Sequence, residues 1–473
     1  MFSIHLIVGI CQFILGIANV ALLITDWIHL YYHVGNSLLL GNGVTAVSLF
    51  SSSIIALCYY RTGNTKMLLG VFTFSMMTIW CALVALFQVC YSYIRVSYFF
   101  FGTSRATIIA FAFTVLFQVI NIISSIFIVL KYKKFLYHHN DEQRRESIVT
   151  HPLASKANSI SCLLGGTCSL LIGVFTIIFF YGIYGSPNCY LGICTLTVGA
   201  LGMFAQRCHN LPALDLIIMF ICRFGILIAI TNMGFATYYF HFIFTFHGLE
   251  YLIVGNLVAY LFTMAFSIFN LICTTLMCYS ASSENRTVGL LTITLRSPAV
   301  STIAKVGYFS GIGQFICSAS IFACTIAACV IWRGDTFASL ALIAAILVLL
   351  SAQLGNHLAL DQSEDFIFIY FVSNISGSVC CVNAFGLAIY EIVALQLSHY
   401  NHNVFILFIF IILILAVAIA LHLNSFVITG RELKIFSGRV SNYRGQLLNN
   451  NDNDNDSNES SESGLAPNTA VNA

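Results

Sequence analysis

Long uncharged stretches dominate the hydrophobic pattern of the chain, and short polar segments separate them. Seven of these runs contain no Asp, Glu, Lys or Arg: 1–25, 27–60, 67–94, 106–130, 306–332, 336–360 and 366–390. Each exceeds the roughly 20 apolar residues that cross a bilayer as a helix. The uncharged runs 157–206 and 392–430 are longer still, so each holds two spans or a span plus a loop.

The polar breaks divide these runs into about twelve transmembrane helices. The first has no basic N-terminal region and no A-x-A cleavage site behind it, so we expect it to be a retained span rather than a signal peptide. The predicted spans are 4–24, 38–60, 67–91, 106–130, 159–183, 190–206, 214–238, 251–278, 306–331, 338–357, 366–390 and 404–424. The fold class is therefore all-α integral membrane.

Composition agrees with this class. Hydrophobic residues make up 59% of the 473 positions and charged residues only 8%, whereas about a quarter of the residues in soluble domains are charged. The formal net charge of +2 and the pattern of basic residues indicate no nucleic-acid-binding surface. We expect the lipid bilayer to be the main partner, and plasma membrane and endomembrane vesicles both fit.

Most of the 17 cysteines lie inside predicted spans, where cysteine acts as a small apolar residue. We place Cys189 in an outer loop near Cys194, so both a small disulfide and two unpaired packing cysteines are open. Cys58, Cys208 and Cys278 fall near cytosolic span ends and are candidate palmitoylation sites. Buried packing is the other interpretation of these three residues.

The lysines and arginines predict the orientation of the chain. With loops placed on alternate sides, 16 of the 20 basic residues lie on the side that holds both termini. The opposite side has Arg95, Arg105 and Arg333, and Arg223 lies inside a span. Because cytosolic loops carry the excess of Lys and Arg, we expect both termini to be cytosolic.

A repeated octet indicates internal duplication. The segment GICQFILG at 9–16 recurs as GIGQFICS at 311–318, 302 residues later, and CSLLIG at 168–173 is a weaker copy. The pattern F-x-x-x-N ends at Asn121 in the fourth span and at Asn270 in the eighth, 149 residues apart. Several spans therefore agree on one register.

These repeats predict three tandem four-helix units in the same orientation. The expected units are 1–134, 156–283 and 303–434, and the segments 135–155 and 284–302 are cytosolic linkers. Each unit has four spans, so it starts and ends in the cytosol, unlike the inverted repeats of many transporters. The segment 435–473 ends in a polar, acidic tract with too few apolar residues for a core, and we expect a disordered cytosolic tail.

Polar side chains inside the spans must find partners or line a wet cavity. Gln12 and Gln314 occupy equivalent places in the two copies of the octet, and Asn121 and Asn270 in the other repeat. We interpret all four as interhelical hydrogen-bonding residues, helped by the close approach that neighbouring glycines allow. A pore-lining role is the alternative.

Two charged residues inside spans are candidate functional groups. Arg223 lies eight residues after Asp215, or about 12 Å along its helix. Its side chain could extend toward the cytosolic headgroups, make a structural hydrogen bond, or serve permeation or ligand binding. Glu391 is the carboxylate in a comparable position, but it lies near the outer end of its helix, which argues against a direct pair.

Little in the sequence indicates an enzyme. There is no H-E-x-x-H, G-x-S-x-G or P-loop, and the histidines have no cysteine or carboxylate partners at metal spacing. We therefore predict no catalytic, cofactor-binding or metal-binding residues. Ser147 follows Arg144 and Arg145 and is a candidate phosphorylation site, while a solvated linker whose lysines touch anionic lipid is the alternative.

The four-helix unit with short loops and G-x-x-Q…G in its first helix resembles the tetraspan families known as MARVEL and membrane-spanning four-domains, subfamily A. Gly9, Gln12 and Gly16 carry the resemblance, together with the small residues 48–53 of the second helix and Ser124 and Ser125 of the fourth. The resemblance implies membrane organisation, vesicle or junction association, and association with receptors or channels. It implies no catalysis.

Three functions follow from the sequence as hypotheses. The first is a multi-pass scaffold or interaction protein that organises membrane partners or lipids. The second is a transporter or channel for a small solute, although the long cytosolic loop follows span four rather than span six. The third, a seven-span chemoreceptor, requires an outside N-terminus and an odd number of spans.

Overall fold

The computed structural model describes residues 2–34, 40–99, 105–144, 156–179, 185–206, 212–246, 250–281, 301–332, 335–358, 362–397, 402–433 and 435. Within these ranges the chain is helical and contains no strand. The helices are α1 (Phe2–Val34), α2 (Leu40–Thr62), α3 (Thr65–Phe99), α4 (Arg105–Arg144), α5 (Lys156–Phe179), α6 (Gly185–Ala205), α7 (Pro212–Phe246), α8 (Glu250–Ala281), α9 (Thr302–Trp332), α10 (Asp335–Leu358), α11 (Glu364–Leu397) and α12 (His402–Glu432).

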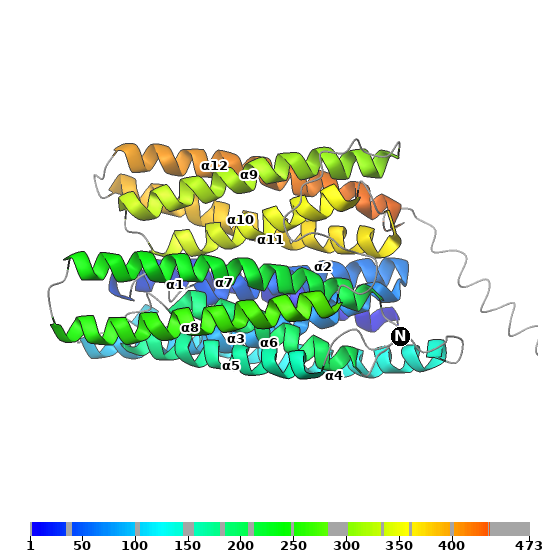
Figure 1. Ribbon diagram of the computed structural model, residues 1–473, viewed down its shortest axis with the longest axis horizontal. Helices are drawn as coiled ribbons and strands as arrows, with labels where there is room; N and C mark the ends of the chain where they lie inside the picture. Colours follow the sequence, from blue (N-terminus) through cyan, green and yellow to red (C-terminus); the bar gives the residue numbers. More distant parts are fainter. Residues whose placement is uncertain are drawn as a thin grey trace, which may run out of the picture.

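All twelve described helices contain a stretch long and apolar enough to cross a membrane. The chain is therefore a multi-pass, all-α integral membrane protein. Figure 1 shows the helices running along one common direction, with α9 and α12 at one edge of the view and α4 and α5 at the opposite edge.

Several helices extend beyond the predicted spans. α4 continues to Arg144, ten residues into the segment 135–155 that we expected to be a linker. Good helix formers such as Lys133, Glu142 and Gln143 prolong the helix beyond the apolar stretch. The rest of that linker, most of the segment 284–302 and the tail from 436 onward lie outside the described residues.

The prediction that Cys189 lies in an outer loop is wrong. α6 begins at Gly185, so Cys189 is helical and fully buried. Pro187 lies in the first turn of α6, where a missing backbone N–H removes no intrahelical hydrogen bond. Cys189 and Cys194 are both free thiols, so the disulfide alternative is wrong.

Helix contacts close three rings of four. α1 packs on α2, α2 on α3, α3 on α4, and α4 returns to α1. The same order of contacts joins α5 through α8 and α9 through α12. We call these sets the first, second and third bundles.

The bundles meet through their second and third helices. α3 packs on α6, α7 on α10, and α11 on α2, so the third helix of each bundle contacts the second helix of another. α7 also contacts α3 and α11. A heterologous contact of this kind forms a closed ring when the rotation returns to the start, and here it does so after three bundles.

Individual contacts at these boundaries involve both apolar and charged groups. The rings of Phe72 and Phe204 lie 4.9 Å apart between α3 and α6. At the start of α3, the Lys66 ammonium lies 2.9 Å from a carboxylate oxygen of Asp365 and 3.3 Å from one of Glu364. The first and third bundles are therefore joined by ion pairs at one end of α3 and α11.

Burial separates the helices into two sets. Between 61% and 89% of the span residues are buried in the inner helices α2, α3, α6, α7, α10 and α11. In the outer helices α1, α4, α5, α8, α9 and α12 the share is 28% to 39%. Exposed large apolar residues such as Ile123 and Leu130 cover the outer helices, which is the surface expected toward lipid tails.

Glycines allow the closest approach between helices. A Cβ at Gly192 of α6 would lie 2.8 Å from the carbonyl oxygen of Gly166 of α5. Gly307 of α9 and Gly355 of α10 form the same arrangement, with each Cβ 2.7 Å from the other carbonyl oxygen. Small residues at such crossings let van der Waals contacts form between backbones, which stabilises helix pairs in a membrane.

Candidate functional site

The third bundle contains a buried polar cluster that includes the predicted Gln314. Gln314 Nε2 of α9 donates to Asn374 Oδ1 of α11 over 2.9 Å. His422 Nδ1 of α12 lies 2.8 Å from the same oxygen. The histidine ring fits because residue 377 is glycine, where a Cβ would lie 2.6 Å from the ring carbon Cε1.

The first bundle contains a larger amide cluster around the predicted Asn121. Gln118 Nε2 of α4 donates to Asn19 Oδ1 of α1 over 2.8 Å and to Asn42 Oδ1 of α2 over 2.5 Å. Asn121 Nδ2 donates to the Asn19 oxygen over 3.3 Å. Three helices are thereby joined by buried, uncharged side chains.

Gln12 lies apart from that cluster. Its Nε2 donates to Ser75 Oγ of α3 over 3.3 Å, and Ser75 Oγ lies 3.3 Å from Ser52 Oγ of α2. Gln12 and Gln314 therefore both contact the third helix of their own bundle. Gln12 makes the longer hydrogen bond.

The second bundle has two separate polar contacts. The predicted Asn270 of α8 donates to Ser169 Oγ of α5 over 2.6 Å. About one turn earlier along α8, Ser267 Oγ accepts from Asn232 of α7 over 2.9 Å, and Asn232 also donates to Asn188 Oδ1 of α6 over 2.8 Å. All four amides singled out in the sequence thus form hydrogen bonds between helices.

Sequence reasoning missed several members of these clusters. Asn19, Asn42 and His422 were not singled out, although each is a polar residue inside an apolar run. The spacing of Gln118 and Asn121 was a usable signal, since residues i and i+3 share a helix face. A polar stripe on one face indicates a neighbouring helix rather than lipid.

Arg223 lies between the second and third bundles. Its side chain is 7% exposed and forms a hydrogen bond with the Cys278 thiol of α8. It lines a small cavity of about 10 Å³ together with Leu350 and Leu354 of α10 and Phe366 of α11. The guanidinium is therefore enclosed by protein at a bundle boundary and does not reach an exposed surface.

The structure describes only some of the other candidate residues, which are one charged residue and the predicted sites of phosphorylation and palmitoylation. Glu391 belongs to α11, but its side chain, like all of Ser147 and Cys208, lies outside the described residues. Cys58 and Cys278 are buried, at 7% and 5% exposure. Acylation of either thiol would require it to become accessible from the membrane surface.

Among the residues that the structure describes, no three His, Cys, Asp or Glu side chains lie close enough together to hold a metal ion. The prediction that the chain has no catalytic, cofactor or metal site remains a prediction.

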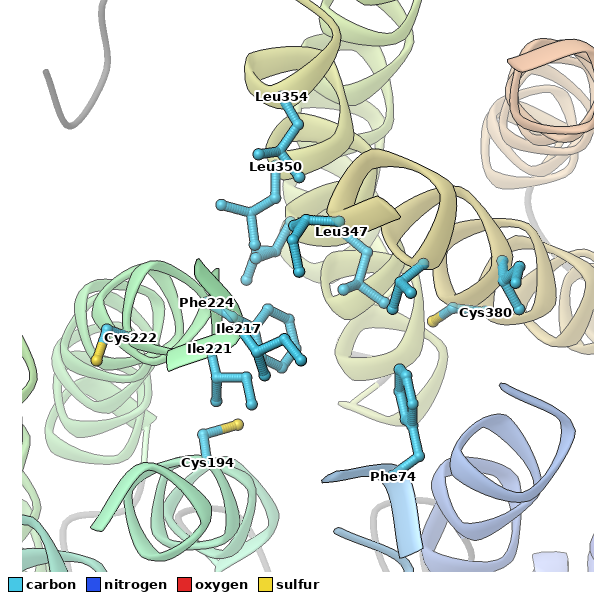
Figure 2. Close-up of a cluster of buried hydrophobic side chains, with 14 of the residues drawn as sticks. Phe74, Cys194, Ile217, Ile221, Cys222, Phe224, Leu347, Leu350, Leu354 and Cys380 are labelled. Carbon is cyan, nitrogen blue, oxygen red and sulfur yellow. The ribbon is translucent and has the colours of Figure 1, made fainter. Parts of the chain in front are cut away.

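A cavity of about 90 Å³ lies where the three bundles meet. Its walls come from α2 and α3 of the first bundle, α7 of the second, and α10 and α11 of the third. Figure 2 shows Phe74, Ile217, Phe224 and Leu347 pointing toward one another from α3, α7 and α10, with Cys380 of α11 beside them. Apolar side chains thus make up most of the lining.

Comparison with protein-family models, with curated proteins and with solved structures found no match to this chain. Function must therefore be argued from the helices, the polar clusters and the cavity.

Proposed function

We propose that the chain is a membrane scaffold built from three tandem four-helix units, with both termini in the cytosol. In this proposal the inner helices hold the units together. The outer helices face lipids and other membrane proteins, whose arrangement the scaffold organises.

The observation that carries the proposal is the separation of inner from outer helices. The most exposed spans, α4 and α12, are also strongly apolar, with mean hydropathy of 2.3 and 3.2. Such a surface suits lipid tails and the apolar faces of other transmembrane helices. The buried amide clusters support the same role, since they join helices within each bundle and uncharged amides suit packing more than ion passage.

The arrangement of the units is supported by the contacts within and between bundles. Each set of four consecutive helices forms a ring of contacts, and an even number of membrane crossings would bring both ends of the chain to one side, which supports this arrangement. The excess of basic residues assigns that side to the cytosol. Epitope tags on both termini should bind antibody only after permeabilisation.

Proximity labelling from the C-terminus tests the scaffold role. The native chain should label a reproducible set of membrane proteins. Replacing Phe127 and Leu130 of α4, each 61% exposed, by alanine should deplete some of that set, because these side chains project from the outer surface. A matched change elsewhere on α4, Val119→Ala, should alter the set less, because Val119 is only 38% exposed.

A small-solute transporter or channel is the second candidate, and the buried Arg223 favours it, since ionisable residues inside membranes commonly mark solute pathways. Solute flux into proteoliposomes should be compared for the native chain, Arg223→Ala and the exposed-site control Arg105→Ala. Reproducible flux that Arg223→Ala abolishes and Arg105→Ala leaves intact would overturn the scaffold proposal.

A further inference from the structure

The central cavity has a lining that is apolar with few exceptions. Hydroxyl groups are contributed by Ser48, Thr73 and Ser376, and thiols by Cys81 and Cys380. None of the lining residues carries a formal charge. Such a lining disfavours ions, and apolar cavities of comparable size stay dry.

Two of the three hydroxyl groups already have partners in the protein. Ser48 Oγ donates to the Thr45 carbonyl oxygen over 2.9 Å. Ser376 Oγ donates to carbonyl oxygens of its own helix, the nearer being Val372 O at 3.1 Å. Both hydroxyl protons are therefore used.

Thr73 differs from these serines. Its side chain is 3% exposed and lines the cavity, and its Oγ1 has no hydrogen-bond partner among the described residues. A helical threonine commonly satisfies its hydroxyl by donating to the carbonyl oxygen one turn earlier, as Thr78 does with Phe74 O over 2.8 Å. A buried hydroxyl without a partner costs free energy, and a ligand that hydrogen-bonds to it removes that cost.

We propose that this cavity binds a small neutral molecule with an apolar body and one hydroxyl or carbonyl group, which hydrogen-bonds to Thr73. The size fits a molecule no larger than benzene, since an apolar cavity of about 150 Å³ in another protein takes up benzene and this one measures about 90 Å³. The ligand would enter from the bilayer, where small neutral molecules of this kind dissolve.

The site would also link the three bundles. Val47 and Phe74 belong to the first bundle, Ile221 to the second, and Leu347 and Val372 to the third, and all line the cavity. A bound molecule adds contacts to every one of them at once. This inference does not depend on the scaffold role.

Photolabelling tests the proposal on the full chain in lipid nanodiscs, with a propanol that carries a diazirine as the probe, which has no more heavy atoms than benzene. The native chain should give saturable labelling on peptides that contain the lining residues of α3, α7 and α11. Labelling confined to the outer helices would overturn the proposal, because it reports only probe dissolved in lipid.

Substitutions test separately the apolar cavity and the hydrogen bond to Thr73. Val372→Phe should abolish the central labelling by filling the cavity. Thr73→Val should weaken it about fivefold through loss of one hydrogen bond, and Thr73→Ser should restore it. Thr195→Val on α6 is the matched control, since Thr195 is buried, bonds to its own helix and does not line the cavity.

Two results would contradict the inference. Central labelling that survives Val372→Phe in a folded chain would mean that the probe lies elsewhere. Equal labelling of the native chain and Thr73→Val would remove the hydrogen bond from the proposal. If Val372→Phe does not fold, the pair Thr73→Val and Thr73→Ser carries the test alone.

Discussion

The inner and outer helices have opposite surroundings. α6 has a mean hydropathy of 1.4 and 89% of its span is buried, whereas α12 has a mean hydropathy of 3.2 and only 28% is buried. In a soluble protein the more apolar helix would lie inside. Here the surrounding solvent is itself apolar, so small and polar residues favour the interior, where packing and hydrogen bonds hold helices together.

Helix α7, the third helix of the second bundle, is an exception to the trend that the more apolar helices lie outside. α7 has a mean hydropathy of 2.4, yet 78% of its span is buried. It contacts helices of all three bundles, so its apolar side chains replace lipid contacts with protein contacts on every side. Mean hydropathy therefore separates the most buried helix, α6, from the highly exposed α12, but it does not predict that α7 is buried.

The largest effect is expected from crowding an inner crossing. Gly192→Leu should destabilise the chain by about 3 kcal/mol or more, because its side chain would meet the backbone of α5. The measurement is loss of folded, monodisperse protein on size-exclusion chromatography and in detergent unfolding. Gly234→Leu on α7 is the matched control, since a Cβ there meets nothing within 4 Å. Equal losses for both variants would contradict the close crossing.

An intermediate effect is expected from the polar cluster of the third bundle. Gln314→Leu should lower the free energy of unfolding by about 1 to 2 kcal/mol, because Asn374 Oδ1 loses a donor. Gln12→Leu should cost less, since Gln12 makes a single hydrogen bond of 3.3 Å. Detergent unfolding of both variants checks the order. A larger loss of unfolding free energy for Gln12→Leu than for Gln314→Leu would contradict the prediction that these hydrogen bonds set the order of the two effects.

The smallest effect is expected at the ion pairs between the first and third bundles. Lys66→Gln should cost about 0.5 kcal/mol, because Lys66 is partly exposed and such pairs contribute little. The loss should shrink in high salt, which screens exposed charges. Lys156→Gln, at an exposed position on α5, is the control. A salt-independent loss at Lys66 would instead indicate lost packing of its aliphatic stem.

The positions of the spans could be predicted from the sequence, but the contacts between their side chains could not. Each predicted span overlaps one described helix, since the apolar length that crosses a bilayer is written directly in the residues. The partners of Gln12 could not be predicted, because the choice of Ser75 depends on how α1 and α3 are rotated and offset. Arg223 was visible as a buried charge, but its place beside Cys278 required the contact between α7 and α8.

The closed ring of bundles also affects stoichiometry. If each bundle were a separate chain, the contacts between third and second helices would join the copies into an assembly. The rate and extent of that assembly would depend on the concentration of the chains. Joining three bundles in one polypeptide makes those encounters intramolecular, so the number is fixed at three and dilution does not separate them. A bundle expressed alone would keep both contacting helices uncovered, and its assembly would again depend on how many copies the membrane holds.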